Sequence, residues 1–376
     1  MQIRILLYTI FIFIFEGCIE NYYPKINDYA DLLVIDGTIT NEPGPYIIRL
    51  SKSSTVYNPE YIPVSGAKMV ISDDFNTEET LVEIEPGVYS TDPSGIRGEV
   101  GKKYRITINT NGKTYQSNYE ELEEPVQIDS VYAKIEYLET AGGSSEGLQF
   151  YLNCKPMDYK KRYFFWIPIE TYKYKADVSL DFIYYGLYEF EGASSDSINE
   201  CWLTQRIFKT FIYSTKDLSK PEISKFPLHY VSTTTKKLSE KYSLLVYQYS
   251  ISEEAYKYWS EIEKQNIESG SLYTSQPYQI RGNLVNINDQ NDVILGYFMA
   301  AGTSKKRIFV DRPQLNFSYP VCKPNVEAFL AMFSDPKPFF PALVTITNEG
   351  LAKAAQECID CRYQGGTNIK PDFWED

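Results

Sequence analysis

The chain has 376 residues and carries 37 lysines and arginines against 50 aspartates and glutamates, which gives a formal net charge of −13. No long basic run interrupts this acidic composition, which excludes binding to a nucleic-acid backbone, because that affinity comes from clustered cations. The only histidine is His229, so the chain lacks the several imidazoles that zinc hydrolases and most metal relays use. We interpret His229 as a structural residue of a strand, and we predict a protein that is not an enzyme and needs no cofactor.

The residue types predict a mainly β fold. The 33 tyrosines and 20 phenylalanines, together with many valines and isoleucines, suit the pleated and half-buried surface of strands. The length allows two or three domains that each bury a core. We predict an N-terminal immunoglobulin-like β-sandwich, followed by a larger β-rich domain with one clear helix at about 252–269 and a disulfide-stapled C-terminal tail.

Residues 1–17 are predicted to be a lipoprotein signal peptide. The apolar run at 5–15 is too short to cross a bilayer as a helix, which needs about 20 residues. It ends in a glycine followed by Cys18, which resembles the lipobox of bacterial lipoproteins. We therefore expect acyl chains on Cys18 and a lipid-anchored tether at 18–29. The alternative is an uncleaved anchor in which Cys18 is a buried cysteine.

Residues 30–124 are predicted to form the β-sandwich. Short strand candidates alternate with turn-rich segments, and alternate side chains of YRITINT share one face, as in a half-buried strand. Asn111 and Gly112 follow this strand as a two-residue hairpin turn, because both residue types accept positive φ. Roughly six or seven strands over this length fit an immunoglobulin-like sandwich.

The charge run EELEEP marks a boundary, and residues 125–376 are predicted to form the larger domain. Its helix is indicated by Ser252 as the N-cap, by Glu253 and Glu254 at the positive end of the helix dipole, and by Gly270 at the C-terminus. The apolar face of this helix is predicted to pack against the sheet. The later segments DVILGYFMAA and KKRIFVD are predicted to form a hairpin.

Four cysteines of this domain are predicted to form two disulfides, because an exported chain meets an oxidising compartment. They are Cys201, Cys322, Cys358 and Cys361. A zinc site and a Cys-x-x-Cys redox couple are the alternatives, but the spacing fits no compact zinc knuckle. The sequence leaves the pairing open among three connectivities. Cys154 is predicted to be a buried free thiol, and the tail after Cys361 is predicted to close the fold.

Three further patterns have a functional and a structural interpretation. GGSSEG matches the Gly-x-Ser-x-Gly elbow with Ser145 as nucleophile, but its flanks predict a polar loop between two strands. NINDQNDV offers oxygen ligands at 288–292 without the spacing of a calcium loop, which predicts a solvated turn. The aromatic segments 162–175 and 182–190 either pack on both faces of a sheet or expose a surface for a peptide or glycan.

Several long segments together resemble one family. LLVIDGTITNEPGPYIIRLSKS, IRGNLVNINDQNDVILGYFMAAGTSKKRIFV and CIDCRYQGGTNIKPDFW are similar to a lipoprotein family of Bacteroidota known as domain of unknown function 4249. The resemblance implies a lipid-anchored outer-membrane protein that is commonly encoded beside a TonB-dependent transporter. It implies no catalytic residues, because the family has none assigned.

The expected function is therefore that of a binding or accessory subunit, in the capture or uptake of a substrate by a TonB-dependent transporter. The expected partners are the outer membrane, through acyl chains on Cys18, that transporter, and a peptide or glycan ligand. A structural or adhesive surface lipoprotein is the alternative. A hydrolase that works with a carboxylate pair instead of histidine is the third interpretation. The sequence does not decide which leaflet face the protein occupies.

Overall fold

A computed structural model describes residues 32–54, 60–140, 143–156, 160, 162–194, 197–268, 279–333 and 341–375. The predicted signal peptide, the tether and its anchor Cys18 lie outside these residues. Within the described part the protein is mainly β, as predicted, with 23 strands in four sheets. The described helices are α2 (Glu253–Glu268), α3 (Val326–Ala331), α4 (Gln356–Ile359), η2 (Lys236–Leu238) and η3 (Cys361–Gln364).

The first sandwich packs two sheets face to face. One sheet contains β1 (Leu33–Thr40), β2 (Ile47–Lys52), β3 (Ile62–Pro63), β6 (Val82–Glu85) and β7 (Val88–Ser90). The facing sheet contains β4 (Lys68–Asp73), β5 (Glu78–Thr80), β8 (Lys103–Thr110), β9 (Lys113–Ser117), β10 (Glu120–Glu121) and β20 (Leu284–Asn286). Alternate side chains of both sheets, among them Ile35, Tyr89 and Ile106, form one buried core. The predicted alternation of apolar and polar side chains in β8 is confirmed, because its apolar side chains face this core.

The predicted hairpin turn joins β8 to β9. Asn111 and Gly112 both have positive φ, of 51° and 73°, and the flanking strands pair from Thr110 and Lys113 onward. A two-residue turn of this kind matches the right-handed twist of the strands that it connects.

One long strand, β21 (Ile294–Asp311), connects the two sandwiches. Its first half pairs in parallel with β1, and its second half pairs antiparallel with β19 (Lys241–Ile251), so that a single ten-stranded sheet runs through both units. Gly296 lies so close to β1 that a Cβ atom there would be 1.8 Å from the carbonyl oxygen of Ile35. Because β20 and the start of β21 both pair with strands of the first sandwich, the chain returns to that unit after leaving it.

The prediction of a hairpin between DVILGYFMAA and KKRIFVD was wrong, because both segments belong to β21. Gly302, between the two segments, lies where neighbouring backbone passes close to the strand. A Cβ atom on Gly302 would be 2.1 Å from the carbonyl oxygen of Glu123. Close packing, and not a turn, accounts for the glycine at this position.

The second sandwich is formed by the other half of the long sheet and a three-stranded sheet. The long sheet contributes β13 (Tyr163–Lys175), β16 (Glu200–Arg206), β17 (Phe211–Ser214) and β19, and the facing sheet contains β11 (Ile128–Thr140), β12 (Gly143–Cys154) and β18 (Ile223–Ser232). Phe164 and Trp166 of β13 belong to the core between these sheets. Phe165 belongs to a separate cluster on the other face, where its ring stacks on that of Trp259 in α2, at 4.6 Å between centroids.

The helix α2 covers the outer face of the long sheet, as predicted from its apolar stripe. Ala255 is fully buried against this face, and Tyr258 lies 4.9 Å from Tyr297 of β21 between ring centroids. Ser252 caps the helix, because its Oγ accepts a hydrogen bond of 3.1 Å from the backbone N–H of Ala255. Such a cap satisfies one of the N–H groups that the first turn leaves without a partner. Gly270, the predicted end of the helix, lies outside the described residues.

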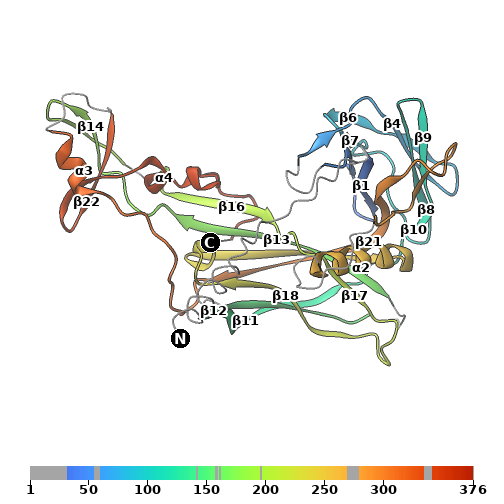
Figure 1. Ribbon diagram of the computed structural model, residues 1–376. Coiled ribbons are helices and arrows are strands. Elements are labelled where there is room, and N and C mark those ends of the chain that lie inside the picture. The colour runs from blue at the N-terminus through green and yellow to red at the C-terminus, as the bar shows by residue number, and fades with distance from the viewer. Residues whose placement is uncertain are drawn as a thin grey trace, which may run out of the picture.

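A third unit, here called the distal lobe, lies at the end of the molecule opposite the first sandwich (Figure 1). Its sheet contains β14 (Phe182–Gly186), β15 (Glu189–Gly192), β22 (Ala342–Thr347) and β23 (Gly350–Lys353). The helix α3 packs on this sheet through Phe329, which contacts the buried ring of Tyr184. The short helix α4 lies between this lobe and the second sandwich (Figure 1).

Candidate functional site

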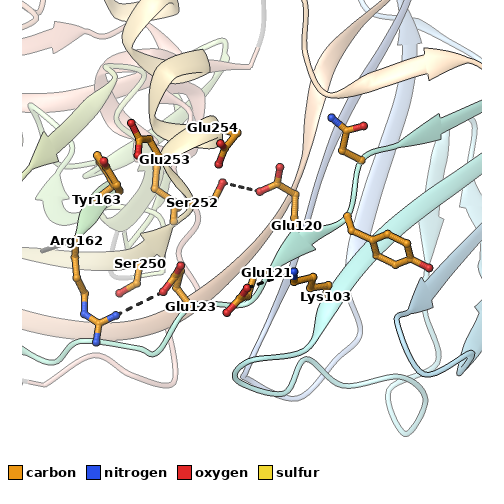
Figure 2. A pocket seen from close by; sticks show the side chains of 13 residues that line it. Lys103, Glu120, Glu121, Glu123, Arg162, Tyr163, Ser250, Ser252, Glu253 and Glu254 are labelled. Atoms are coloured by element: carbon orange, nitrogen blue, oxygen red, sulfur yellow. Dashed lines mark hydrogen bonds and ion pairs between the residues drawn. The ribbon is translucent and has the colours of Figure 1, made fainter. Parts of the chain in front are cut away.

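A hollow of about 480 Å³ lies where the first sandwich, the second sandwich and the start of α2 meet. Figure 2 shows Glu120 reaching from β10 toward Ser252, with Arg162 and Glu123 on the other side of the opening. The residues that line it are mostly polar or charged: Lys103, Asn118, Tyr119, Glu120, Glu121, Glu123, Arg162, Tyr163, Ser250, Ile251, Ser252, Glu253 and Glu254.

Glu120 is the buried carboxylate of this hollow, with 4% of its surface exposed. It accepts hydrogen bonds from the hydroxyl of Tyr297, from the hydroxyl of Ser252 at 2.7 Å and from the amide of Asn283 at 3.3 Å. Burial raises the pKa of Glu120, while these three donors act in the opposite direction. Glu120 therefore joins β10 to α2 and to β21.

The start of α2 contributes two further carboxylates. Glu253 forms an ion pair with Lys216 at 2.7 Å and a second one with Lys257 at 3.3 Å. The hydrogen bond with Lys216 is the main reason that the pKa of Glu253 falls to about 2. Glu254 is exposed. Acidic residues in the first turn also interact favourably with the positive end of the helix dipole.

Arg162 is the buried cation on the opposite wall. Its guanidinium group lies 3.1 Å from the carboxylate of Glu124 and 3.6 Å from that of Glu123. Burial raises the pKa of Glu123, and the neighbouring charge of Glu121 raises it further. The two ion pairs compensate the buried charge of Arg162, which needs a partner.

The lining as a whole carries negative charge, with five glutamates against one lysine and one arginine. Four of its five carboxylates have a hydrogen-bond or ion-pair partner within the protein, and the negative charge of the lining as a whole attracts cations. Among the described residues, no group of three or more His, Cys, Asp or Glu side chains is arranged to hold a metal ion. The arrangement is therefore suited to a ligand with cationic and hydrogen-bonding groups.

The four predicted disulfide cysteines pair beside α4, at the end of the second sandwich away from this hollow (Figure 1). Cys201 of β16 bonds to Cys361 of η3, and Cys322 bonds to Cys358 of α4, with Cα–Cα distances of 5.8 Å and 5.5 Å. This settles the connectivity that the sequence left open. Cys154 is free and buried, as predicted, and burial raises its pKa to about 12.

The tail after Cys361 packs back onto the second sandwich. The ring of Trp374 is buried and lies 5.5 Å from Phe309 of β21 and 6.4 Å from Trp202 of β16 between centroids. Thr367 forms an isolated bridge with Trp202. The tail is thus held by ring packing and backbone pairing in addition to the disulfides.

His229 lies in β18, in a second polar cluster inside the second sandwich. Its Nε2 is 3.5 Å from the carboxylate of Glu170, which also forms an ion pair with Lys237 and accepts a 2.8 Å hydrogen bond from Tyr242. Although burial acts to raise it, the proximity of His229 and hydrogen bonds from Gln205 and Lys237 bring the pKa of Glu170 to about 2. This cluster is packed between strands, which fits the structural role predicted for His229.

The prediction of a loop at GGSSEG was wrong, because the segment from Gly143 onward belongs to β12. Ser145 pairs with Leu138 of β11, and its carbonyl oxygen accepts a hydrogen bond of 2.6 Å from the hydroxyl of Tyr230. The extended pairing on both sides replaces the strand-to-helix turn that a nucleophile elbow needs.

The predicted turn at 288–292 contributes to the packing of the first sandwich. Asp292 accepts hydrogen bonds of 2.7 Å from the hydroxyl of Tyr115 and from the amide of Asn286. It also forms an ion pair with Lys113 at 3.0 Å. These contacts give this carboxylate a structural role between β9 and β20.

The residues of the hollow were visible in the sequence, but with other interpretations. The charge run at 120–124 was interpreted as a domain boundary, and Ser252 with its two following glutamates as a helix start. The helix start is confirmed, because Ser252 caps α2, whereas Glu120 and Glu121 of the charge run form β10 and pair with β8 of the first sandwich. Their common position in space depends on strand pairing between distant parts of the chain, which the sequence pattern does not contain.

The two sandwiches, the connecting strand and the polar hollow at their junction define a mainly β protein with a candidate ligand-binding site between domains. Its described helices include none that is long and apolar enough to span a bilayer. The family model for domain of unknown function 4249 matches residues 19–307, and the chain belongs to that family. No curated protein matches the chain.

Proposed function

We propose that the protein is a lipid-anchored binding subunit of the outer membrane that helps a TonB-dependent transporter to capture or admit a substrate. The observation that carries the binding role is the hollow between the sandwiches, whose lining is acidic and in which Glu120 and Glu123 are held by hydrogen-bond or ion-pair partners. Ligand sites occur preferentially at domain interfaces of this kind.

The anchoring part of the proposal depends on the N-terminal sequence. Cys18 follows a short apolar segment and a glycine, as in lipoprotein precursors, and acyl chains there would hold the folded part at a membrane surface. A Cys18→Ser variant is expected to appear in the soluble fraction, whereas the unchanged chain stays with the membranes. A Cys154→Ser variant is the matched control, because Cys154 is buried in the fold, and it is expected to stay with the membranes.

The partner is tested by affinity purification of the tagged full chain from detergent-solubilised outer membranes. We expect a TonB-dependent transporter to be recovered in near-equal amount and to be identified by mass spectrometry. Recovery of the lipoprotein without any transporter would contradict the proposal.

The hollow is tested with a lysine tripeptide as a cationic probe, by isothermal titration of the purified chain. The negative lining predicts binding that weakens as salt is added. Glu121→Gln combined with Glu254→Gln is expected to weaken it at least several-fold, because both side chains are exposed in the hollow and neither belongs to the buried network. Glu85→Gln with Glu349→Gln, which removes two exposed carboxylates elsewhere, is expected to leave binding unchanged.

A further inference from the structure

The distal lobe ends in a hairpin whose turn has an unusual composition. Strands β14 and β15 are joined by Leu187 and Tyr188, and both residues have positive φ, of 50° and 66°. Glycine and asparagine adopt this conformation readily, whereas leucine and tyrosine are strained in it. The turn therefore carries two large side chains at positions where folding alone favours small ones.

Both side chains project into solvent. Leu187 is 98% exposed and Tyr188 is 77% exposed. Among the described large apolar residues, none has a larger exposed fraction than Leu187. The ring of Tyr188 rests on Phe333 at 5.3 Å between centroids. Contiguous exposed apolar side chains of this kind mark interaction sites. Of the two aromatic segments in the sequence, the one at 182–190 thus places part of its side chains on the surface.

The lobe beneath the turn is built to hold it in place. Aromatic rings pack under the hairpin, with Tyr184 4.6 Å from Phe190 and 5.3 Å from Phe333 between centroids. The disulfides Cys201–Cys361 and Cys322–Cys358 tie the segments around the lobe to the second sandwich. A tip that is ordered before binding loses less conformational entropy when a partner closes over it.

The charges beside the tip limit what the partner can be. Glu189 and Glu191 follow the turn and are exposed. Glu191 accepts a 2.8 Å hydrogen bond from Tyr185, and no described cation forms an ion pair with either carboxylate. A complementary surface would place lysine or arginine around an apolar pocket. An anionic lipid surface is disfavoured, because it would repel both carboxylates.

We propose that Leu187 and Tyr188 insert into an apolar pocket, bordered by lysine or arginine, on the transporter partner. This inference rests on the proposed function, since it names the surface by which that function is carried out. The hairpin tip is thus the docking element, and the hollow at the other end of the second sandwich stays open to a ligand.

The test compares recovery of the TonB-dependent transporter with the unchanged chain and with hairpin variants, in the same purification. Leu187→Asn alone and Leu187→Asn with Tyr188→Gly are expected to lower recovery at least ten-fold. Glu189→Lys with Glu191→Lys is expected to lower it as well, because it reverses the charge at the rim. Val82→Asn with Ile84→Asn removes two exposed apolar residues of β6 in the first sandwich, and full recovery is expected.

Each outcome separates the two proposals. Equal recovery with the hairpin variants and the unchanged chain overturns the docking inference alone. No transporter with the unchanged chain overturns the proposed function and this inference with it. Misfolding does not explain a loss of recovery with Leu187→Asn, because the Leu187 side chain is almost fully exposed. The thermal midpoint of the double variant is expected to equal or exceed that of the unchanged chain, because asparagine and glycine adopt positive φ readily. The unchanged chain and the double variant are also tested for binding to phosphatidylglycerol vesicles. If the unchanged chain binds the vesicles and the double variant does not, the hairpin tip binds a bilayer, and the docking inference is overturned.

Discussion

The hydroxyl of Ser252 donates a hydrogen bond of 2.7 Å to the carboxylate of Glu120, and this contact joins the cap of α2 to strand β10 of the first sandwich. The same hydroxyl accepts the N–H of Ala255. One side chain therefore begins a helix and closes the junction between two units.

Replacing Glu120 by glutamine is expected to destabilise the protein by about 1–3 kcal/mol, because the new NH₂ group would face a hydroxyl donor in place of an acceptor oxygen. Chemical unfolding in urea measures the change. Glu121→Gln is the control: its side chain is 49% exposed, and a change within about 0.5 kcal/mol is expected. Equal effects of the two variants would show that the buried network contributes no stability.

The buried carboxylate Glu170 predicts a loss of stability in acid. Its pKa is about 2 in the folded protein, below the ordinary value of 4.5, so the ionised form is favoured by folding. The stabilisation, about 3 kcal/mol at most, is present above the ordinary pKa and is lost as the pH falls through the folded one.

Urea unfolding of the unchanged chain and of Glu170→Gln, at several pH values, checks this prediction. The difference between the two is expected to be largest near neutral pH and to shrink in acid. Glu200→Gln is the control, because the ion pair of Glu200 with Lys173 is partly exposed and such pairs contribute little. A difference that does not change with pH would contradict the low pKa of Glu170.

The two disulfides are expected to differ in their contribution to stability. Cys201 and Cys361 are 160 residues apart, whereas Cys322 and Cys358 are 36 apart. In the chain-entropy model the larger loop contributes about 5 kcal/mol and the smaller about 4 kcal/mol. Replacing each pair by alanine and measuring the unfolding free energy tests this order, and a larger loss from the shorter loop would contradict it.

Cys154 is expected to be unreactive in the folded protein. Burial raises its pKa to about 12, and a buried thiol is both protonated and inaccessible. A thiol reagent is expected to modify no cysteine of the folded Cys18→Ser chain and one cysteine after unfolding without reductant. Rapid modification in the folded state would show that the second sandwich opens.

Local patterns in the sequence were sufficient for several elements. The alternation in β8, the Asn111-Gly112 turn and the capped helix at α2 all follow from short-range preferences of the backbone and side chains. The same short-range logic failed at GGSSEG and at the middle of β21. There, pairing with distant strands decided the structure, and Gly302 serves close packing instead of a turn.

In the candidate site, too, local patterns predicted single elements but not how those elements meet. Ser252 and Glu120 are 132 residues apart in the sequence, and no local signal links the charge run of one to the helix start of the other. They meet because β21 pairs with β1 on one side and with β19 on the other.

Composition and short-range patterns were enough to show that the chain is mainly β, acidic and poor in histidine, that its N-terminus resembles a lipoprotein signal, and that four cysteines were available for pairing. These properties depend on composition and on neighbours along the chain. The folded chain was needed to show which cysteines pair, that the two sandwiches share one sheet, and that the hollow and the exposed hairpin tip lie at separate places. These depend on contacts between residues far apart in the sequence, whose energies no local pattern records.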